Sequence, residues 1–370
     1  MRKLTAVCTV ACLAMALVAP AEATVQDAAD YLVNIQSSDG GWSWVNGGAS
    51  ASNITGATGI GLIRYYNVAG GSQYLDAAKA GGGFLQNHTY DNGETRFSTY
   101  DPYYCWQLSL AAGDNTWSNF AAADFFGELA AGTYGPADYD TAGWIGAVQT
   151  ARTGTWNNLR PWEFSTIAVT ARNIGSSSQA DAFLGAILDG LDTLDSTAPA
   201  SIYTDLIGVA GGVRGLALEG VTSFDPINSP HHAGIDGIST LVDLADYLAG
   251  QQNADGSWFD HSAATSESSK DTQVTAYAVL ALEAVADVLA TADYADELAA
   301  GRAWLLSMQD DTTGGFFYGP AYMYPPINNE VTGEALAATV VPEPASIIVW
   351  SLIALVSVTC VWRRRKRSAA

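Results

Sequence analysis

Hydrophobic positions along this chain follow helical periods and fall into two kinds of segment. In the stretch that ends at Gln252, apolar residues recur at steps of three and four, which places one apolar stripe along a helix. The run from Val274 to Ala286 is apolar almost all round, apart from Thr275 and Glu283. A helix of that second kind belongs between other helices. The chain therefore alternates half-buried helices with fully buried ones.

This alternation predicts an all-α fold, an α/α toroid in which about six helix pairs form a double-layer barrel. A helical bundle or an open solenoid is the structural alternative. Outer helices are predicted near 25–36, 73–88, 116–131, 178–194, 238–252 and 295–309. Inner helices are predicted near 54–68, 100–112, 138–151, 203–219, 271–290 and 328–338. The stretch 160–174 fits neither group.

A recurring phrase ends three of the predicted outer helices. It consists of an aromatic residue followed by leucine, then a glutamine, then a glycine close before a large aromatic residue. Two copies share one spacing although more than two hundred residues separate them, so the phrase indicates an internal repeat. The glutamines and final aromatic residues are Gln36 with Trp42, Gln252 with Trp258, and Gln309 with Phe316.

These phrases resemble the QW repeat of squalene and hopene cyclases and the related prenyltransferase repeats. The resemblance implies a terpene cyclase-like toroid over residues 24–338, in which the glutamine and the aromatic residue tie an outer helix to its neighbour. A glutamine amide can satisfy unpaired backbone groups at two helix ends, while an indole covers those hydrogen bonds from water. The repeat residues are therefore expected to be structural.

The motifs that carry out the chemistry of those families are missing from this sequence. Terpene cyclisation uses Asp-x-Asp-Asp, of which Asp138-Tyr139-Asp140 is only a fragment, and the Asp-Asp-x-x-Asp diphosphate motif is missing from the sequence. Cys105 has no matching histidine for a prenyltransferase zinc site and does not begin a Cys-Gly-Glu-Gln thioester sequence. We predict no metal site and assign no cofactor, because the other candidate ligands match no defined spacing. These ligands are His231, His232, Asp236 and His261.

Acidic residues stand where several inner helices begin, so they could converge on one rim of the ring. Helix capping is the structural alternative, because Asp is a favoured N-cap and acids complement the helix dipole. Glu330 and Glu334 head the last inner helix and belong to the same group of helix-start acids. The candidate catalytic acids are Asp101, Asp138, Asp140, Glu163 and Asp271.

Some polysaccharide lyases and glycoside hydrolases also use α/α toroids, with acids beside an aromatic-lined cleft. Paired carboxylates serve as acid and base in glycoside hydrolysis. Aromatic rings can stack on sugar faces, although they more often pack in a core. The accompanying side chains are Tyr100, Tyr103, Tyr104, Trp106, Trp144, Trp156, Trp162 and Arg160.

The first residues have the order of a secretory signal peptide. Arg2 and Lys3 precede an apolar run, and Ala21 and Ala23 supply the small residues that a signal peptidase reads. Cleavage after Ala23 is expected, so that residues 1–23 are removed. An N-terminal membrane anchor is the alternative.

The C-terminal residues predict a membrane-spanning helix. Residues 345–362 carry no charge, and a helix of that length is about 27 Å long, enough to cross a hydrocarbon core. The arginine-rich tail, 363–370, would stay in the cytoplasm.

A linker, 339–344, precedes the span and contains Pro342, Glu343 and Pro344. Pro-Glu-Pro, an apolar helix and an arginine cluster together resemble the PEP-CTERM sorting signal of Gram-negative bacteria. The resemblance implies that an exosortase removes the tail and delivers the protein to the cell envelope or the extracellular matrix. A permanent single-pass anchor is the alternative, and both place residues 24–338 outside the cytoplasm.

Charge and cysteine content narrow the partners. The formal net charge is −22, which disfavours nucleic acid and anionic membrane surfaces as partners of the ectodomain. Only Cys105 lies between the leader and the span, so the ectodomain forms no internal disulfide. The sequence therefore predicts an exported protein with a binding or structural role towards a glycan or a lipid. An extracellular enzyme of the polysaccharide lyase or glycoside hydrolase kind, acting at the acid-lined rim, is the alternative.

Overall fold

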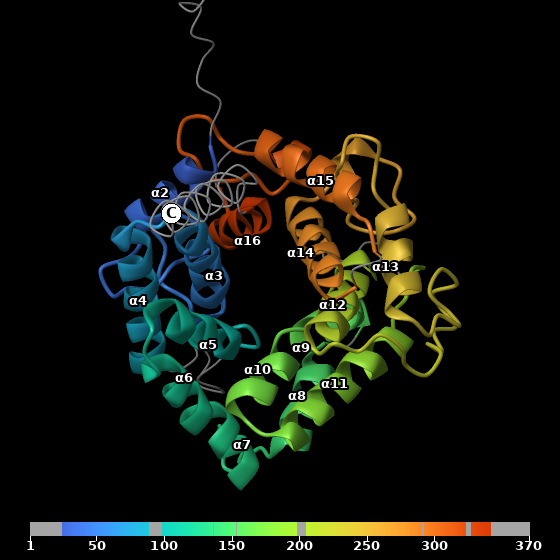
Figure 1. Ribbon diagram of the computed structural model, residues 1–370, viewed down its shortest axis with the longest axis horizontal. Coiled ribbons are helices and arrows are strands. Elements are labelled where there is room, and N and C mark those ends of the chain that lie inside the picture. The colour runs from blue at the N-terminus through green and yellow to red at the C-terminus, as the bar shows by residue number, and fades with distance from the viewer. Residues whose placement is uncertain are drawn as a thin grey trace, which may run out of the picture.

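The computed structural model describes residues 24–88, 98–135, 137–152, 154–197, 205–289, 292–322 and 327–341. Within these residues the regular structure is helical, and extended segments pair only as isolated bridges. The helices lie in two concentric layers that form a ring (Figure 1). The predicted α/α toroid is therefore confirmed.

The inner layer supplies the wall around the centre of the ring. Each inner helix packs on the next in chain order, and the last packs on the first. The inner helices are α3 (Ser52–Ala69), α5 (Asp101–Ala112), α9 (Arg160–Phe164) with α10 (Ile167–Ile174), α12 (Asp205–Leu218), α14 (Thr272–Val288) and α16 (Asn329–Thr339).

The outer layer covers the apolar faces of the inner one. Its helices are α2 (Val25–Asn34), α4 (Ser72–Asn87), α6 (Thr116–Ala121) continued by η1 (Ala122–Gly127) and α7 (Glu128–Ala131), α11 (Ser177–Asp192), α13 (Leu241–Gly250) and α15 (Ala295–Ser307). The remaining elements are α8 (Thr141–Ala151), η2 (Gly154–Leu159), η3 (Glu267–Ser269) and η4 (Pro320–Tyr322).

One predicted inner helix is wrong. The segment predicted over 138–151 forms α8, which packs on α11 and α7 and buries only Trp144. Most of its other residues are small, so the helix gains little from full burial. The inner position belongs to α9 and α10, which the sequence pattern leaves unassigned because a turn at Ser165 and Thr166 breaks the helical period.

The glutamines of the repeated phrase each join two outer helices. The Gln36 side-chain amide donates to Gly40 O and to Ala77 O in α4, both at 2.8 Å. Gln252 repeats this arrangement between α13 and α15, where its amide donates to Glu297 O at 2.9 Å. One side chain thus satisfies carbonyls in its own turn and in the next outer helix.

The aromatic residues of the phrase join the outer layer to the inner one. The Trp42 and Trp258 side chains are fully buried, and their indole N–H groups donate to Leu32 O and Leu248 O at 2.8 Å. Backbone N–H groups of Trp42, Trp258 and Phe316 donate to hydroxyls near the starts of inner helices. The accepting residues are Thr55, Thr275 and Thr332.

Both layers close where the chain returns to its start. In the outer layer, the Gln309 amide donates to Gly314 O at 2.8 Å and to Thr24 O, at the N-cap of α2, at 2.9 Å. In the inner layer, a Cβ added to Gly61 would lie 2.4 Å from Gly333 O, so α3 and α16 approach at a distance that only glycine permits. The alternative of an open solenoid is therefore excluded.

The predicted signal peptide, the Pro342-Glu343-Pro344 motif, the membrane span and the basic tail lie outside the described residues. Among the described helices, none is both long enough and apolar enough to cross a membrane.

Candidate functional site

Three glutamates of two inner helices lie near enough for their charges to interact, at the end of the ring where the inner helices begin. Glu163 lies in α9, and Glu330 and Glu334 lie in the first two turns of α16. The charge of Glu163 acts on Glu330, and that of Glu330 acts on Glu334. We call these three residues the central acid cluster.

Glu334 is the most firmly held member of the cluster. Its side chain is buried, Gln273 Nε2 donates to Oε2 at 2.9 Å, and the Tyr277 hydroxyl donates to Oε1. Burial and, secondarily, the charge of Glu330 raise the pKa of Glu334 well above its ordinary value. These contacts fix the carboxyl between α14 and α16.

Glu330 has a different environment. Its side chain is half-buried, and its carboxyl forms no hydrogen bond with any residue that the structure describes. Burial and then the negative charge of Glu163 raise the pKa of Glu330 to about 8. Glu330 therefore holds a proton at neutral pH and is free to donate it.

Glu163 carries the negative charge beside Glu330. Arg152 Nε donates to Glu163 Oε1 at 2.7 Å, and the Thr99 hydroxyl donates to Oε2 at 2.5 Å. The Glu163 side chain is buried, whereas the Arg152 side chain is 36% exposed, so the ion pair lies at the border between the interior and water. The cluster thus combines a protonated carboxyl with a neighbouring carboxylate.

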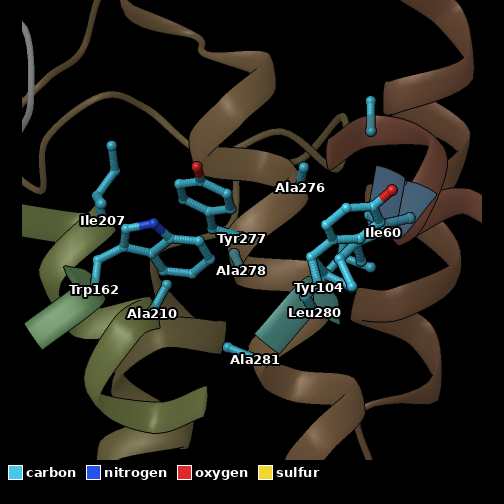
Figure 2. Packing of buried hydrophobic residues seen from close by; sticks show 14 of the residues in the cluster. Ile60, Tyr104, Trp162, Ile207, Ala210, Ala276, Tyr277, Ala278, Leu280 and Ala281 are labelled. Carbon is cyan, nitrogen blue, oxygen red and sulfur yellow. The ribbon is translucent and has the colours of Figure 1, made fainter. Parts of the chain in front are cut away.

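Aromatic rings and one buried cation pack together on the neighbouring inner helices, and we call this group the aromatic wall. Trp162 and Tyr277 lie against each other (Figure 2). Their ring centroids are 3.4 Å apart and their planes are 20° from parallel. The Arg214 guanidinium carbon lies 5.5 to 5.8 Å from the ring centroids of Tyr100, Tyr103 and Trp162.

Arg214 has few polar partners for a buried charge. Its side chain is 3% exposed, and it donates to the Tyr100 hydroxyl at 3.1 Å. It forms no ion pair with a carboxylate of the described chain, although a buried charge normally has such a partner. An anionic group of a ligand would supply the missing charge.

Two of the other acids predicted as catalytic, Asp101 and Asp271, hold helix starts, and the charge of Asp271 also contributes to the raised pKa of Glu334. Asp101 is buried between α3 and α5, where it accepts from Ser98 N at 2.7 Å, and burial raises its pKa to about 7. Asp271 caps α14 by accepting from Val274 N at 2.9 Å, and burial raises its pKa to about 7. Both carboxyls stabilise the start of a helix by accepting a backbone N–H.

Asp138 and Asp140 are exposed residues just before α8. Asp140 is the N-cap of that helix and accepts from Gly143 N at 2.7 Å. Asp138 has a φ of 50°, in the turn that precedes the cap. Neither has a described contact with Glu163, Glu330 or Glu334.

The accompanying side chains divide between site and core. Tyr103 lies edge-on to Trp106, which extends the aromatic wall. Trp144 packs in an aromatic core with Phe125, the Tyr104 hydroxyl donates to Ala78 O, and Arg160 donates to backbone carbonyls. The Trp156 side chain lies outside the part of the chain that is described.

The histidines do not assemble a metal site. His232 Nε2 lies 2.9 Å from Asp205 Oδ2, and both side chains are buried. Within the described residues, no group of three or more His, Cys, Asp or Glu side chains is arranged to hold a metal ion.

Five residues of the site were not among the predicted candidates. Each is a polar or charged residue within an otherwise apolar inner helix, and two pairs are spaced four apart so that both members lie on one helix face. That spacing is the signal that could have found them. These residues are Arg214, Gln273, Tyr277, Glu330 and Glu334.

Comparison with known proteins gives a fold relationship. No protein-family model matches the chain, and no curated protein matches it. The unsaturated glucuronyl hydrolase from Bacillus sp. GL1, responsible for the degradation of glycosaminoglycan, is similar in structure with a TM-score of 0.58 at 14% identity, over 88% of this chain and 97% of that one. A structure described as a UGL variant with dGlcA-Glc-Rha-Glc gives 0.52 at 14% identity, over 87% and 96%.

These similarities support the toroid and do not support a terpene cyclase identity.

Proposed function

We propose that this protein is a glycoside hydrolase-like enzyme that acts at the central acid cluster. The observation that carries the proposal is Glu330, a half-buried carboxyl that holds its proton at neutral pH, lies beside a carboxylate and forms no hydrogen bond with the described chain. The sequence favours a binding or structural role, but such a role does not explain a protonated carboxyl without a hydrogen-bond partner. Of the two functions derived from the sequence, the enzymatic one therefore fits better.

The chemistry follows from the two protonation states. Glycoside hydrolysis needs an acid that protonates the departing oxygen and a carboxylate that activates water or stabilises positive charge on the sugar. Glu330 takes the first role. Glu163 takes the second, because its two oxygens have lone pairs beyond those that accept from Arg152 and Thr99. Gln273 and Tyr277 hold the Glu334 carboxyl in place, four residues after Glu330 in α16.

The substrate we propose is an acidic saccharide. Arg214 is a buried cation whose charge no carboxylate of the described chain neutralises, and a sugar carboxylate or sulfate would neutralise it. Tyr100 and Tyr103 beside it are half-buried and offer apolar surface to a sugar ring. The fold is shared with an unsaturated glucuronyl hydrolase, whose name specifies an acidic sugar.

The location we propose is outside the cytoplasm. The signal peptide and the PEP-CTERM-like tail are the basis of this proposal, with signal peptidase and an exosortase as processing partners. A net charge of −22 favours solubility outside the cell, although it does not attract an acidic substrate, so binding of such a substrate depends on the local charge of Arg214.

The test is incubation of the purified protein with neutral and acidic oligosaccharides, including a hyaluronan tetrasaccharide, and with polyprenyl compounds. Products are followed by mass spectrometry and binding by calorimetry. Release of a sugar from the acidic members is expected. Binding of a glycan or a polyprenyl compound without any product would instead establish the binding role.

A further inference from the structure

One aromatic side chain remains exposed at the end of the ring that holds the acid cluster. Trp44 is 42% exposed, in the loop between α2 and α3. Among the large exposed hydrophobic residues of the described chain it is the only aromatic one. Single exposed apolar residues are common, so exposure by itself indicates little.

The backbone beside Trp44 is fixed to the helix that carries Glu330. Asn329 N donates to Trp44 O at 2.9 Å, and Asn329 Nδ2 donates to Ser43 O at 2.9 Å. The Asn329 side chain is buried, and its Oδ1 accepts from the Tyr31 hydroxyl at 2.9 Å. The residue next to Asn329 is Glu330. The backbone of Trp44 is therefore held against the residue that precedes the proposed acid in the chain.

This arrangement suits a binding surface. Fixing a loop before the ligand arrives lowers the conformational entropy lost on binding. An exposed indole offers a flat apolar face, which matches the C–H face of a sugar ring. A saccharide whose reacting bond lies at Glu330 and which extends out of the ring would pass the start of α16, where Trp44 is anchored.

We propose that Trp44 is a stacking platform for a second sugar of an oligosaccharide substrate, beyond the bond that is cleaved. The inference rests on the proposed function and adds to it a preference for substrates longer than one sugar. Trp44 acts by binding and orienting the chain and takes no part in bond cleavage.

The test compares Trp44→Ala and Trp44→Phe with the wild type on two probes, 4-nitrophenyl β-glucuronide and a hyaluronan tetrasaccharide. Trp44→Ala is expected to lower kcat/KM for the tetrasaccharide about 3- to 10-fold more than for the one-sugar probe, mainly through KM. Trp44→Phe should retain part of the difference. Leu110→Ala, which removes an exposed side chain at the other end of α5, is the control and should behave as the wild type.

Tetrasaccharide binding, measured by calorimetry, gives a readout that does not depend on turnover. Weaker binding by Trp44→Ala than by the wild type supports the platform even where the proposed hydrolysis fails. Equal binding by both proteins, or no binding by the wild type, overturns the platform whether or not hydrolysis is observed.

Discussion

Glu330 and Asp271 both stand at the start of an inner helix, yet their carboxyls have different roles. Asp271 accepts a backbone N–H of its own helix, as an N-cap does. Glu330 lies two residues past the N-cap of its helix, Asn328, and its carboxyl forms no hydrogen bond with the described residues. A helix-start acid that does not cap is available for chemistry.

The raised pKa of Glu330 predicts the pH dependence of turnover. A reaction that needs this acid protonated should proceed at a constant rate below about pH 8 and slow about tenfold per pH unit above it. The measurement is kcat/KM from pH 5 to 10 at constant ionic strength. A rate that already falls above about pH 5 would contradict the assignment, because an ordinary glutamate loses its proton there.

Asp140 is expected to contribute to stability and not to turnover. Asp140→Ala removes the cap of α8 and should lower the free energy of unfolding by about 1 kcal/mol without changing turnover. Denaturant unfolding and the hydrolysis assay measure the two effects. Glu163→Gln is the matched comparison, since it should impair turnover. Loss of turnover in Asp140→Ala would place catalysis at α8 instead of the acid cluster.

At the scale of helices, the repeated phrase combines three kinds of contact in a short segment. A glutamine joins two outer helices, an indole N–H closes the turn, and a backbone N–H reaches an inner helix. A second hydrogen bond between outer helices also repeats. The Tyr74 hydroxyl donates to Asp30, and the Tyr294 hydroxyl donates to Asp246, both at 2.8 Å. The repeat therefore carries inter-helix contacts beyond the glutamine and the aromatic residue.

Gln309 is the member of the repeat that closes the outer layer. Gln309→Ala leaves the Gly314 carbonyl without its donor and removes the Gln309 donor from Thr24 O, which keeps its bond from Asp27 N, and we expect a loss of about 1–3 kcal/mol in the free energy of unfolding. The control is Gln251→Ala, because that side chain makes no hydrogen bond to the described chain. Chemical denaturation of both variants tests the effect. Equal stability of the two would show that the closing contact contributes nothing measurable.

The helices were largely predictable because their signals are local. The apolar period and the Gln-to-Trp spacing of the phrases ending at Trp42 and Trp258 lie within a few turns of chain. The segment 138–151 was misplaced because composition reports how apolar a helix is and not which layer it joins. The turn after Phe164 interrupts the helical period, so the pattern did not identify α9 and α10 as inner helices.

The site was predictable only in part, because it depends on ring closure. Glu163 was a candidate, but its neighbours Glu330 and Glu334 come from the last inner helix. Glu330 and Glu334 come near Glu163 only when α16 packs on α3 and the ring closes. No sequence spacing expresses a contact between residues so far apart.

For the whole molecule, the buried acids predict greater stability at acidic pH. Burial raises the pKa of Asp101 and Asp271 to about 7 and that of Glu330 to about 8. The folded state then keeps protons that the unfolded state has lost above about pH 4, so stability falls as pH rises from there to 8. Relief of repulsion among the acids acts in the same direction.

Thermal unfolding between pH 5 and 8.5 measures this dependence. The Tm should fall steadily as the pH rises. Asp101→Asn, which is neutral at every pH, should flatten the curve. A Tm that rises with pH would mean that these acids are ionised in the folded state.

The most direct measurement compares product release from an acidic oligosaccharide by the wild type and by Glu330→Gln, prepared in parallel and matched by Tm. The side chains have nearly the same shape, and only the glutamate can donate its proton to a departing sugar oxygen. The account predicts sugar release by the wild type and a loss of at least about a hundredfold in the variant. Equal release by both proteins would contradict it.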